Sequence, residues 1–260
     1  IKKGEYIYTE KGLCKVDDLK NGDNILGGTV SGLHEFDDEI YKIKFRNGTS
    51  IEVNGEHPFM TENGWVKALE LTNNNKVEFQ KGTSIKGSKS IGIKKAKLFG
   101  YLYSDGYIKP SKTLKFTNNN KLFIDEVVDL SVEEFGLSPL IVKNGNGCDA
   151  LLTTRIMKKG SNNLKNYIRE HNMTKDTFGF ITELQVDELK EFINGYFNGD
   201  GWLNIYKDRK YDRVEIGLAI GLEERRAYEM QYILWRLGIN SKVEKRIFSN
   251  STASFYQVRV

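Results

Sequence analysis

Two segments of this sequence place an aspartate directly after a pair of small residues that are spaced four apart. The first runs from Gly100 to Asp105 as GYLYSD, and the second runs from Gly195 to Asp200 as GYFNGD. Residues four apart lie on one face of a helix, so each segment predicts a helix with a smooth face that ends at an acid. Such a face lets another helix approach closely, as in small-x-x-x-small motifs. We therefore expect the two helices to touch.

A carboxylate is poorly placed at the C-terminal end of a helix. The negative end of the helix dipole costs up to about 1 kcal/mol there, and bringing two acids together adds repulsion. Stability therefore does not explain Asp105 and Asp200. A divalent cation between them removes the penalty, because Mg²⁺ takes oxygen ligands and leaves positions open for phosphate and water. Gly106 and Gly201 follow the acids, where a left-handed helix cap is usual.

An internal repeat surrounds the two acids. The first copy begins LFGYLYSDGYI, continues through LKFT and ends in VEEFGLSPLIV; the second begins FINGYFNGDGWLN, continues through VEIGLAI and ends in YILWRLGINSKVEK. Both copies predict a helix, Asp-Gly, strands, a second helix and another strand, so we expect a pseudo-symmetric α+β domain. The flanking apolar residues that we expect to bury against the sheets are Leu98, Phe99, Leu102, Ile193, Tyr196 and Phe197.

The first part of the chain, to about Leu71, has a different pattern. Its segments EYIYTEKG, VDDLKNGDNIL, IYKIKFRNGTSIEV and HPFMTENGWVKALEL predict an all-β domain of short strands. Asn-Gly pairs at 21–22, 47–48 and 63–64 suit tight turns. A polar stretch from Thr72 to about Lys95 predicts a linker. The predicted divisions are an N-terminal domain at 1–80, a linker or basic loop at 81–95, and a second domain at 96–260, with repeats at about 96–180 and 181–260.

Composition limits the remaining possibilities. The chain has 260 residues, 39% of them hydrophobic, which is enough for the cores of two modest domains. Cys14 and Cys148 have no metal-ligand spacing, so we expect neither disulfides nor zinc, and a reducing cytoplasm fits. No apolar run approaches the ~20 residues that span a bilayer, so no membrane association is expected. The 39 Lys and Arg residues permit nucleic-acid binding, but solvated lysines are their ordinary interpretation at a net charge of +4.

The repeat resembles a known motif. LFGYLYSDG and INGYFNGDG are similar to the two copies of the LAGLIDADG motif of homing endonucleases, and YILWRLGINSKV resembles the segment that follows the second copy. The resemblance implies an αββαββα unit repeated, with saddle-shaped sheets in the DNA major groove and the motif helices at the central interface. It implies Asp105 and Asp200 as ligands of Mg²⁺ or Mn²⁺. The implied reaction is hydrolysis of one phosphodiester in each strand of double-stranded DNA at a long recognition site, and we expect a monomer.

The same resemblance implies a lysine near each acid that polarises water or steadies phosphate. Lys175 in NMTKDTFGF matches one of them best. The other is Lys242 or Lys245, of which we assign Lys245. Basic residues near the repeat strands are candidates for DNA contacts. These candidates are Lys109, Lys112, Lys115, Lys207, Arg209 and Arg213.

The N-terminal domain carries a second resemblance. GEYIYTEKGLCKVDDLKNGDNIL and GTSIEVNGEHPFMTENGWVKALEL are similar to the first two splicing blocks of inteins, which implies a Hint fold. His57 matches the block histidine that helps activate the upstream scissile peptide. Two departures stand out: the nucleophile would precede Ile1, and the usual block threonine is Asn54. The chain as given also stops at Val260 before the closing strand, so we do not expect it to complete splicing.

Three functions follow from these patterns. The leading one is an intein-associated homing endonuclease that makes a site-specific double-strand break. The second is a LAGLIDADG protein that no longer cleaves and acts as a DNA-binding regulator or RNA maturase, which the intact Asp105 and Asp200 argue against. The third is an intein whose working chemistry is splicing alone.

Overall fold

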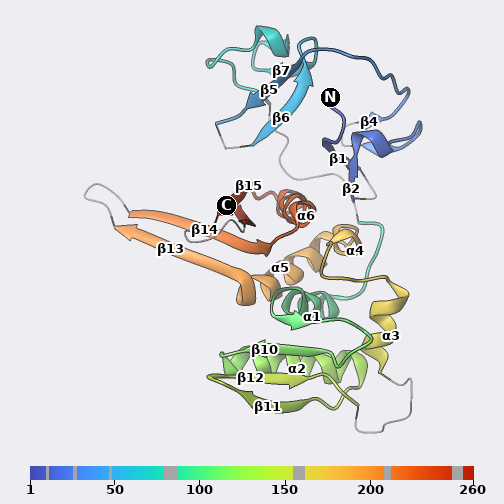
Figure 1. Ribbon diagram of the computed structural model, residues 1–260, viewed down its shortest axis with the longest axis vertical. Helices are drawn as coiled ribbons and strands as arrows, with labels where there is room; N and C mark the ends of the chain where they lie inside the picture. Colours follow the sequence, from blue (N-terminus) through green and yellow to red (C-terminus); the bar gives the residue numbers. More distant parts are fainter. Residues whose placement is uncertain are drawn as a thin grey trace.

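The computed structural model describes most of the chain, in the ranges 1–9, 12–25, 28–46, 49–78, 87–154, 162–207, 212–247 and 254–260. The N-terminal strands lie at one end of the molecule, and the sheet of the first repeat lies at the other (Figure 1). Helices α1 (Ile93–Ser104) and α5 (Val186–Asp200) lie between this sheet and the sheet of the second repeat. Among the described residues, no helix combines the length and apolar character needed to cross a lipid bilayer.

The N-terminal part is built from short strands, which confirms the all-β prediction. One four-stranded sheet has the order β2-β1-β3-β4, and the pairs β5–β6 and β7–β8 form two separate hairpins. Gly64 has a φ of 97° in the β7–β8 turn, as its Asn-Gly pair predicted, whereas the pair at 47–48 lies outside the described residues. The elements are β1 (Tyr6–Thr9), β2 (Gly12–Lys15), η1 (Val16–Asp18), β3 (Asn24–Ile25), β4 (Gly28–Thr29), β5 (Ile40–Lys44), β6 (Ser50–Asn54), β7 (Pro58–Thr61), β8 (Gly64–Lys67) and η2 (Ala68–Glu70).

The rest of the chain follows the predicted repeat. The first copy has the order αββαββα, and the second has the same order as far as its last strand. The first copy contains α1 (Ile93–Ser104), β9 (Gly106–Tyr107), β10 (Lys115–Asn118), α2 (Lys121–Phe135), β11 (Leu140–Asn144), β12 (Gly147–Leu151) and α3 (Asn163–Glu170). A short α4 (Gly179–Thr182) precedes the second copy, which contains α5 (Val186–Asp200), β13 (Gly201–Lys207), β14 (Asp212–Gly221), α6 (Glu224–Arg236), β15 (Lys242–Ile247) and β16 (Ser254–Arg259).

Each repeat forms one antiparallel sheet with a covered face and an open face. The first sheet has the order β11-β12-β10-β9 and the second β13-β14-β16-β15. In the first sheet Phe116 and Ala150 are buried on the side of α2, and in the second Leu218 and Val258 are buried on the side of α6. Because side chains alternate along a strand, the residues on either side of these four point to the open face.

Helices α1 and α5 cross in close contact, as the small residues predicted. A Cβ on Gly100 would lie 2.2 Å from the carbonyl oxygen of Phe192, and a Cβ on Gly195 would lie 2.2 Å from that of Lys97. Real Cβ atoms do not approach backbone atoms so closely, so only glycine fits at either position. The six flanking apolar residues pack in or against the main core, also as predicted.

The segment that leads into α1 is tied to the start of α5. Glu188 Oε1 accepts hydrogen bonds from the hydroxyl of Ser90 (2.7 Å) and from the N–H groups of Ile91 (2.7 Å) and Gly92 (2.6 Å). Lys89 forms an ion pair of 2.7 Å with Glu183. Residues 87–92, within the predicted linker, are therefore fixed to the second repeat, and residues 81–86 lie outside the described part of the chain.

The N-terminal strands pack on α6 through aromatic side chains. The ring of Tyr8 stacks on Tyr232 and Trp235 at centroid distances of 4.9 and 5.1 Å. The ring of Tyr6 lies 5.4 Å from that of Tyr228. Such aromatic pairs add about 0.5–1.5 kcal/mol each beyond the area that they bury, so the two parts of the chain share a real interface.

Candidate active site

The crossing of the two helices brings the two acids together. Asp105 is the C-cap of α1, and Asp200 is the last residue of α5. A Cβ on Gly199 would lie 2.2 Å from the hydroxyl of Ser104 and 2.9 Å from Oδ2 of Asp105. The absence of a side chain at Gly199 therefore leaves room for Ser104 and for the Asp105 carboxylate against α5.

The backbone conformations of the two glycines that follow the acids differ from our prediction. Gly201 has φ −83° and ψ 150°, and Gly106 begins a strand, so neither adopts the left-handed conformation. The prediction of left-handed caps was wrong because the chain passes directly from each helix into a strand. Close approach explains the glycines instead: a Cβ would lie 2.4 Å from the carbonyl oxygen of Leu102 at Gly106, and 2.4 Å from that of Phe197 at Gly201.

Burial raises the pKa of both acids, and repulsion from Asp105 adds to the increase at Asp200. Burial raises the pKa of Asp105, while a 2.7 Å hydrogen bond from Asn118 Nδ2 and the charge of Lys175 act against that increase. Burial also raises the pKa of Asp200, and the charge of Asp105 raises it further, with Lys175 and Arg226 acting against them. A cation placed between two such carboxylates would stabilise their charged form.

Lys175 completes the cluster. It lies between α3 and α4, and its ammonium donates a 2.5 Å hydrogen bond to the carbonyl oxygen of Ser104, next to Asp105. Burial and the charge of Arg226 lower the pKa of Lys175 to about 8, although Asp200 and Asp105 both favour its protonated form. The structure therefore brings Asp105, Asp200 and Lys175 together.

Lys245 lies in β15, beside Tyr256 of β16. Lys245 pairs with Tyr256 across β15 and β16, and its ammonium lies 5.8 Å from the centre of that ring. Both side chains are on the face that α6 covers, because Val258, two residues after Tyr256, is fully buried. Lys242, the alternative that the sequence left open, is on the open face and contacts Glu244 at 2.5 Å. The strand register places Lys245 and Lys242 on opposite faces of the sheet, and the assignment of Lys245 to the catalytic centre stays a prediction.

Arg226 in α6 is a member of the site that the sequence reasoning missed. It is only 8% exposed, and its guanidinium donates to the carbonyl oxygens of Ile220 (2.9 Å) and Tyr103 (3.3 Å). It lies 4.5 Å from the ring centre of Phe178. A signal existed, because Arg226 shares the apolar stripe of α6 with the buried Met230. An arginine in such a stripe needs internal partners, which here are the backbone carbonyls of Ile220 and Tyr103.

The predicted DNA contacts divide between the two sheet faces and a loop. Lys109 and Lys112 are exposed between β9 and β10. Lys115 is on the open face of the first sheet, 3.1 Å from Asp149. Lys207 alternates with Tyr206 in β13 and so points to the covered face of the second sheet.

Arg213 is on the open face of the second sheet, where it forms an ion pair with Glu215. It is the candidate that the structure places most favourably, because 64% of its side chain is exposed. Arg209 lies outside the described residues.

The two splicing-block residues lie at the end of β6. The N–H of His57 donates to the carbonyl oxygen of Asn54 (3.2 Å), and the Asn54 side chain donates to Asp38 (2.9 Å). Burial lowers the pKa of His57.

The two carboxylates can be compared with the ligands that different metal ions need. In the described part of the chain, no group of three or more His, Cys, Asp or Glu side chains is placed to hold a metal ion. Asp105 and Asp200 thus offer two carboxylates alone. Mg²⁺ is commonly held by one or two carboxylates, with water and substrate phosphate as the other ligands. The pair fits such an ion and does not fit a zinc site with four protein ligands.

Comparison with protein families is consistent with this geometry. Residues 187–260 match the family model of the LAGLIDADG-like domain. The match includes Asp200 and every described element of the second repeat after the start of α5. The C-terminal part of the chain is thus similar to a LAGLIDADG-like domain, in agreement with the resemblance of INGYFNGDG.

The chain is also similar to segments of larger proteins and to a solved structure. It is 22% identical over 218 residues to the replicative DNA helicase DnaB of Synechocystis sp., covering 79% of this chain and 24% of the helicase. It is 28% identical over 188 residues to a component of the A-type ATP synthase of Pyrococcus abyssi, covering 71% of this chain and 17% of that component. The chain therefore spans a quarter or less of these relatives. The crystal structure of I-DmoI in complex with DNA and Mn is 16% identical, with a TM-score of 0.44, covering 64% of this chain and 88% of that one.

Proposed function

We propose that this chain is a site-specific endonuclease that makes a double-strand break in DNA by metal-dependent phosphodiester hydrolysis. The observation that carries the proposal is the meeting of Asp105 and Asp200 at the crossing of α1 and α5, with Lys175 beside them. One acid comes from each repeat, which suits a reaction that has to be carried out once on each strand.

Each residue of the cluster has a role in this proposal. Asp105 and Asp200 hold Mg²⁺ or Mn²⁺, which when bound stabilises negative charge on the phosphate and polarises water. Asn118 orients Asp105 through its hydrogen bond. Lys175 uses one N–H on Ser104 and keeps its other donors for a phosphate oxygen or a water. Arg226 is a positioning residue, because it is buried and acts on the acids through the backbone of Tyr103 and through its charge.

The open faces of the two sheets are the proposed DNA-binding surface. They carry Lys115 in the first repeat and Arg213 in the second, both on the side away from the covering helices. Phosphate contacts give affinity and base contacts give sequence preference, and a long recognition site needs both. One chain supplies both repeats, which supports a monomer.

We also propose that the endonuclease is part of an intein, with the N-terminal strands as a portion of its Hint domain. The match of His57 to the block histidine supports this, since the resemblance assigns that histidine to the activation of the peptide just upstream. The matched relatives support it too. A helicase and a component of an ATP synthase share no activity by name, yet each contains a similar segment over a minor part of its length, as an inserted element would.

A cleavage selection tests the enzymatic proposal. The protein is incubated with Mg²⁺ and a library of randomised duplex DNA, and the cut ends are sequenced. We expect cuts in both strands at one long site, and no cuts with Mg²⁺ removed by chelation. Selective binding without cleavage would instead favour a regulator that does not cut DNA, and neither binding nor cleavage would reject the proposal.

A further inference from the structure

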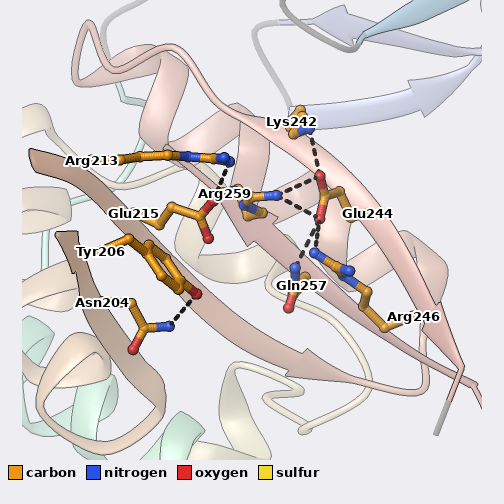
Figure 2. A network of polar contacts seen from close by, with 9 residues as sticks. All are labelled: Asn204, Tyr206, Arg213, Glu215, Lys242, Glu244, Arg246, Gln257 and Arg259. Carbon is orange, nitrogen blue, oxygen red and sulfur yellow. Dashed lines mark hydrogen bonds and ion pairs between the residues drawn. The ribbon is translucent and has the colours of Figure 1, made fainter. Parts of the chain in front are cut away.

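A polar network covers the open face of the second sheet (Figure 2). Glu215 on β14 and Glu244 on β15 lie on either side of Arg259 on β16. Arg259 NH2 contacts Glu215 Oε1 at 2.6 Å, and Arg259 NH1 contacts Glu244 Oε1 at 3.2 Å. The three side chains are 15–17% exposed, so they form a nearly closed clamp in which both terminal nitrogens of the arginine are occupied.

Two further arginines extend from the clamp toward solvent. Arg213 forms an ion pair with Glu215, and Arg246 NH2 contacts Glu244 Oε2 at 3.0 Å. Their side chains are 64% and 50% exposed. A guanidinium has five N–H donors, so one carboxylate contact fixes its direction and leaves other donors facing outward.

The two glutamates do not suit a surface that contacts phosphates alone. Glu244 also accepts hydrogen bonds from Lys242 (2.5 Å) and Gln257 (2.9 Å). These partners favour the charged form of the carboxylate. A buried carboxylate repels phosphate, and a surface built for phosphate would omit it. A carboxylate is useful where a long side chain has to be held in one orientation, because fixing a flexible side chain only on binding costs about 0.5–1.5 kcal/mol.

We infer that Arg213 and Arg246 are specificity-determining residues that each select a guanine in the major groove, and that Glu215, Arg259 and Glu244 position them. This inference rests on the proposed DNA-cleaving function. A guanidinium held in one plane matches guanine O6 and N7 with two hydrogen bonds, which is the commonest specific contact of arginine with DNA.

The strand register separates the two arginines. Gly217, Arg259 and Lys242 form one row across β14, β16 and β15. Arg213 lies four residues before this row in β14, and Arg246 lies four residues after it in β15, which runs in the same direction. Eight steps of about 3.3 Å place the two Cα atoms about 26 Å apart along the strands. The two arginines therefore select two base pairs that are not adjacent.

Binding selection from a randomised duplex library tests the inference, with the full chain and Ca²⁺ in place of Mg²⁺ to slow cleavage. Arg213→Gln and Arg246→Gln should each lose preference at one guanine, at different positions, by about 5- to 150-fold. Arg213→Lys keeps the charge and should also lose that preference. Glu215→Gln should relax the position that Arg213→Gln relaxes.

Lys109→Gln is the matched control, because Lys109 is exposed in a loop outside the network. It should weaken binding to all sequences alike and reduce the salt dependence by about one phosphate contact. If the two arginine variants behave like this control and keep every base preference, they contact phosphate and the inference is wrong. If the unsubstituted protein selects no sequence at all, the proposed function itself fails, and the inference fails with it.

Discussion

Asp105 and Asp200 occupy equivalent positions in the two repeats, but their surroundings differ. Asp105 accepts a hydrogen bond from Asn118 and is acted on by one cation, Lys175, whereas two cations, Lys175 and Arg226, act on Asp200. The open faces of the two sheets differ in the same way, because more cationic side chains surround the acids of the second repeat. In the first repeat Asp149 is held by Lys115, Thr117 and Asn144.

In the second repeat two glutamates are held by four cationic side chains and a glutamine. The symmetry is therefore a property of the backbone and of the helix crossing. The polar side chains have diverged, as expected for a protein that reads two different half-sites with one chain.

The helix crossing should respond equally to changes in either repeat. Gly100→Leu and Gly195→Leu each force a side chain against a backbone carbonyl 2.2 Å from the Cβ position. We expect each to lower the free energy of unfolding by about 3 kcal/mol or more, although helix propensity favours leucine by up to about 1 kcal/mol. Denaturant unfolding measures both. Asn194→Leu, on the exposed side of α5, is the control and should change stability little. A stabilised Gly195→Leu would rule out the crossing.

Lys175→Met should raise stability near neutral pH while it abolishes cleavage. The pKa of Lys175 is lowered to about 8 from an ordinary value of 10.5, so below pH 8 the folded state carries a charge that burial disfavours. Between pH 8 and 10.5 the unfolded state binds more protons, so the wild type gains stability as pH rises.

The advantage of Lys175→Met should therefore be largest below pH 8, at roughly 3 kcal/mol before the lost hydrogen bond to Ser104 is counted, and should disappear above pH 10.5. Unfolding measured from about pH 6 to pH 11 gives the curve across both pKa values. A difference that does not depend on pH would mean that Lys175 is not buried beside the acids.

Asn118→Ala should affect one repeat only. The hydrogen bond from Asn118 lowers the pKa of Asp105, so its loss raises that pKa further. Cleavage should then decline with falling pH at a higher pH than in the wild type, with one strand cut more slowly and nicked DNA accumulating. Stability should fall by about 1 kcal/mol at most. Equal slowing of both strands would show that the two acids act as one inseparable unit.

Most of the architecture and part of the candidate site could be predicted from the sequence. Small residues at 100, 104, 195 and 199 predicted the helix crossing, because a close approach leaves no alternative to small side chains. The lysines were harder, because a shift of one residue in strand register moves a side chain to the other face. That is why Lys242 and Lys245 could not be separated before the pairing of β15 with β16 was known.

Arg226 was missed for a related reason. Its partners are carbonyl oxygens of Ile220 and Tyr103, and backbone acceptors leave no mark on the sequence. The glycines after the acids were recognised as necessary, but for the wrong reason. Close approach and a left-handed conformation demand the same residue, and only the backbone angles distinguish them.

The most direct test of the central claim compares cleavage and binding in Asp105→Asn and Asp200→Asn. Each variant keeps the shape of the side chain and removes its charge, so the fold and the DNA-binding faces should be retained. Plasmid carrying the selected site is incubated with each protein and Mg²⁺, and affinity for the same site is measured in Ca²⁺. We predict that double-strand cleavage is abolished in both variants and that specific binding is largely retained. Cleavage of both strands by either variant would contradict the account, since it would remove that acid from the catalytic centre.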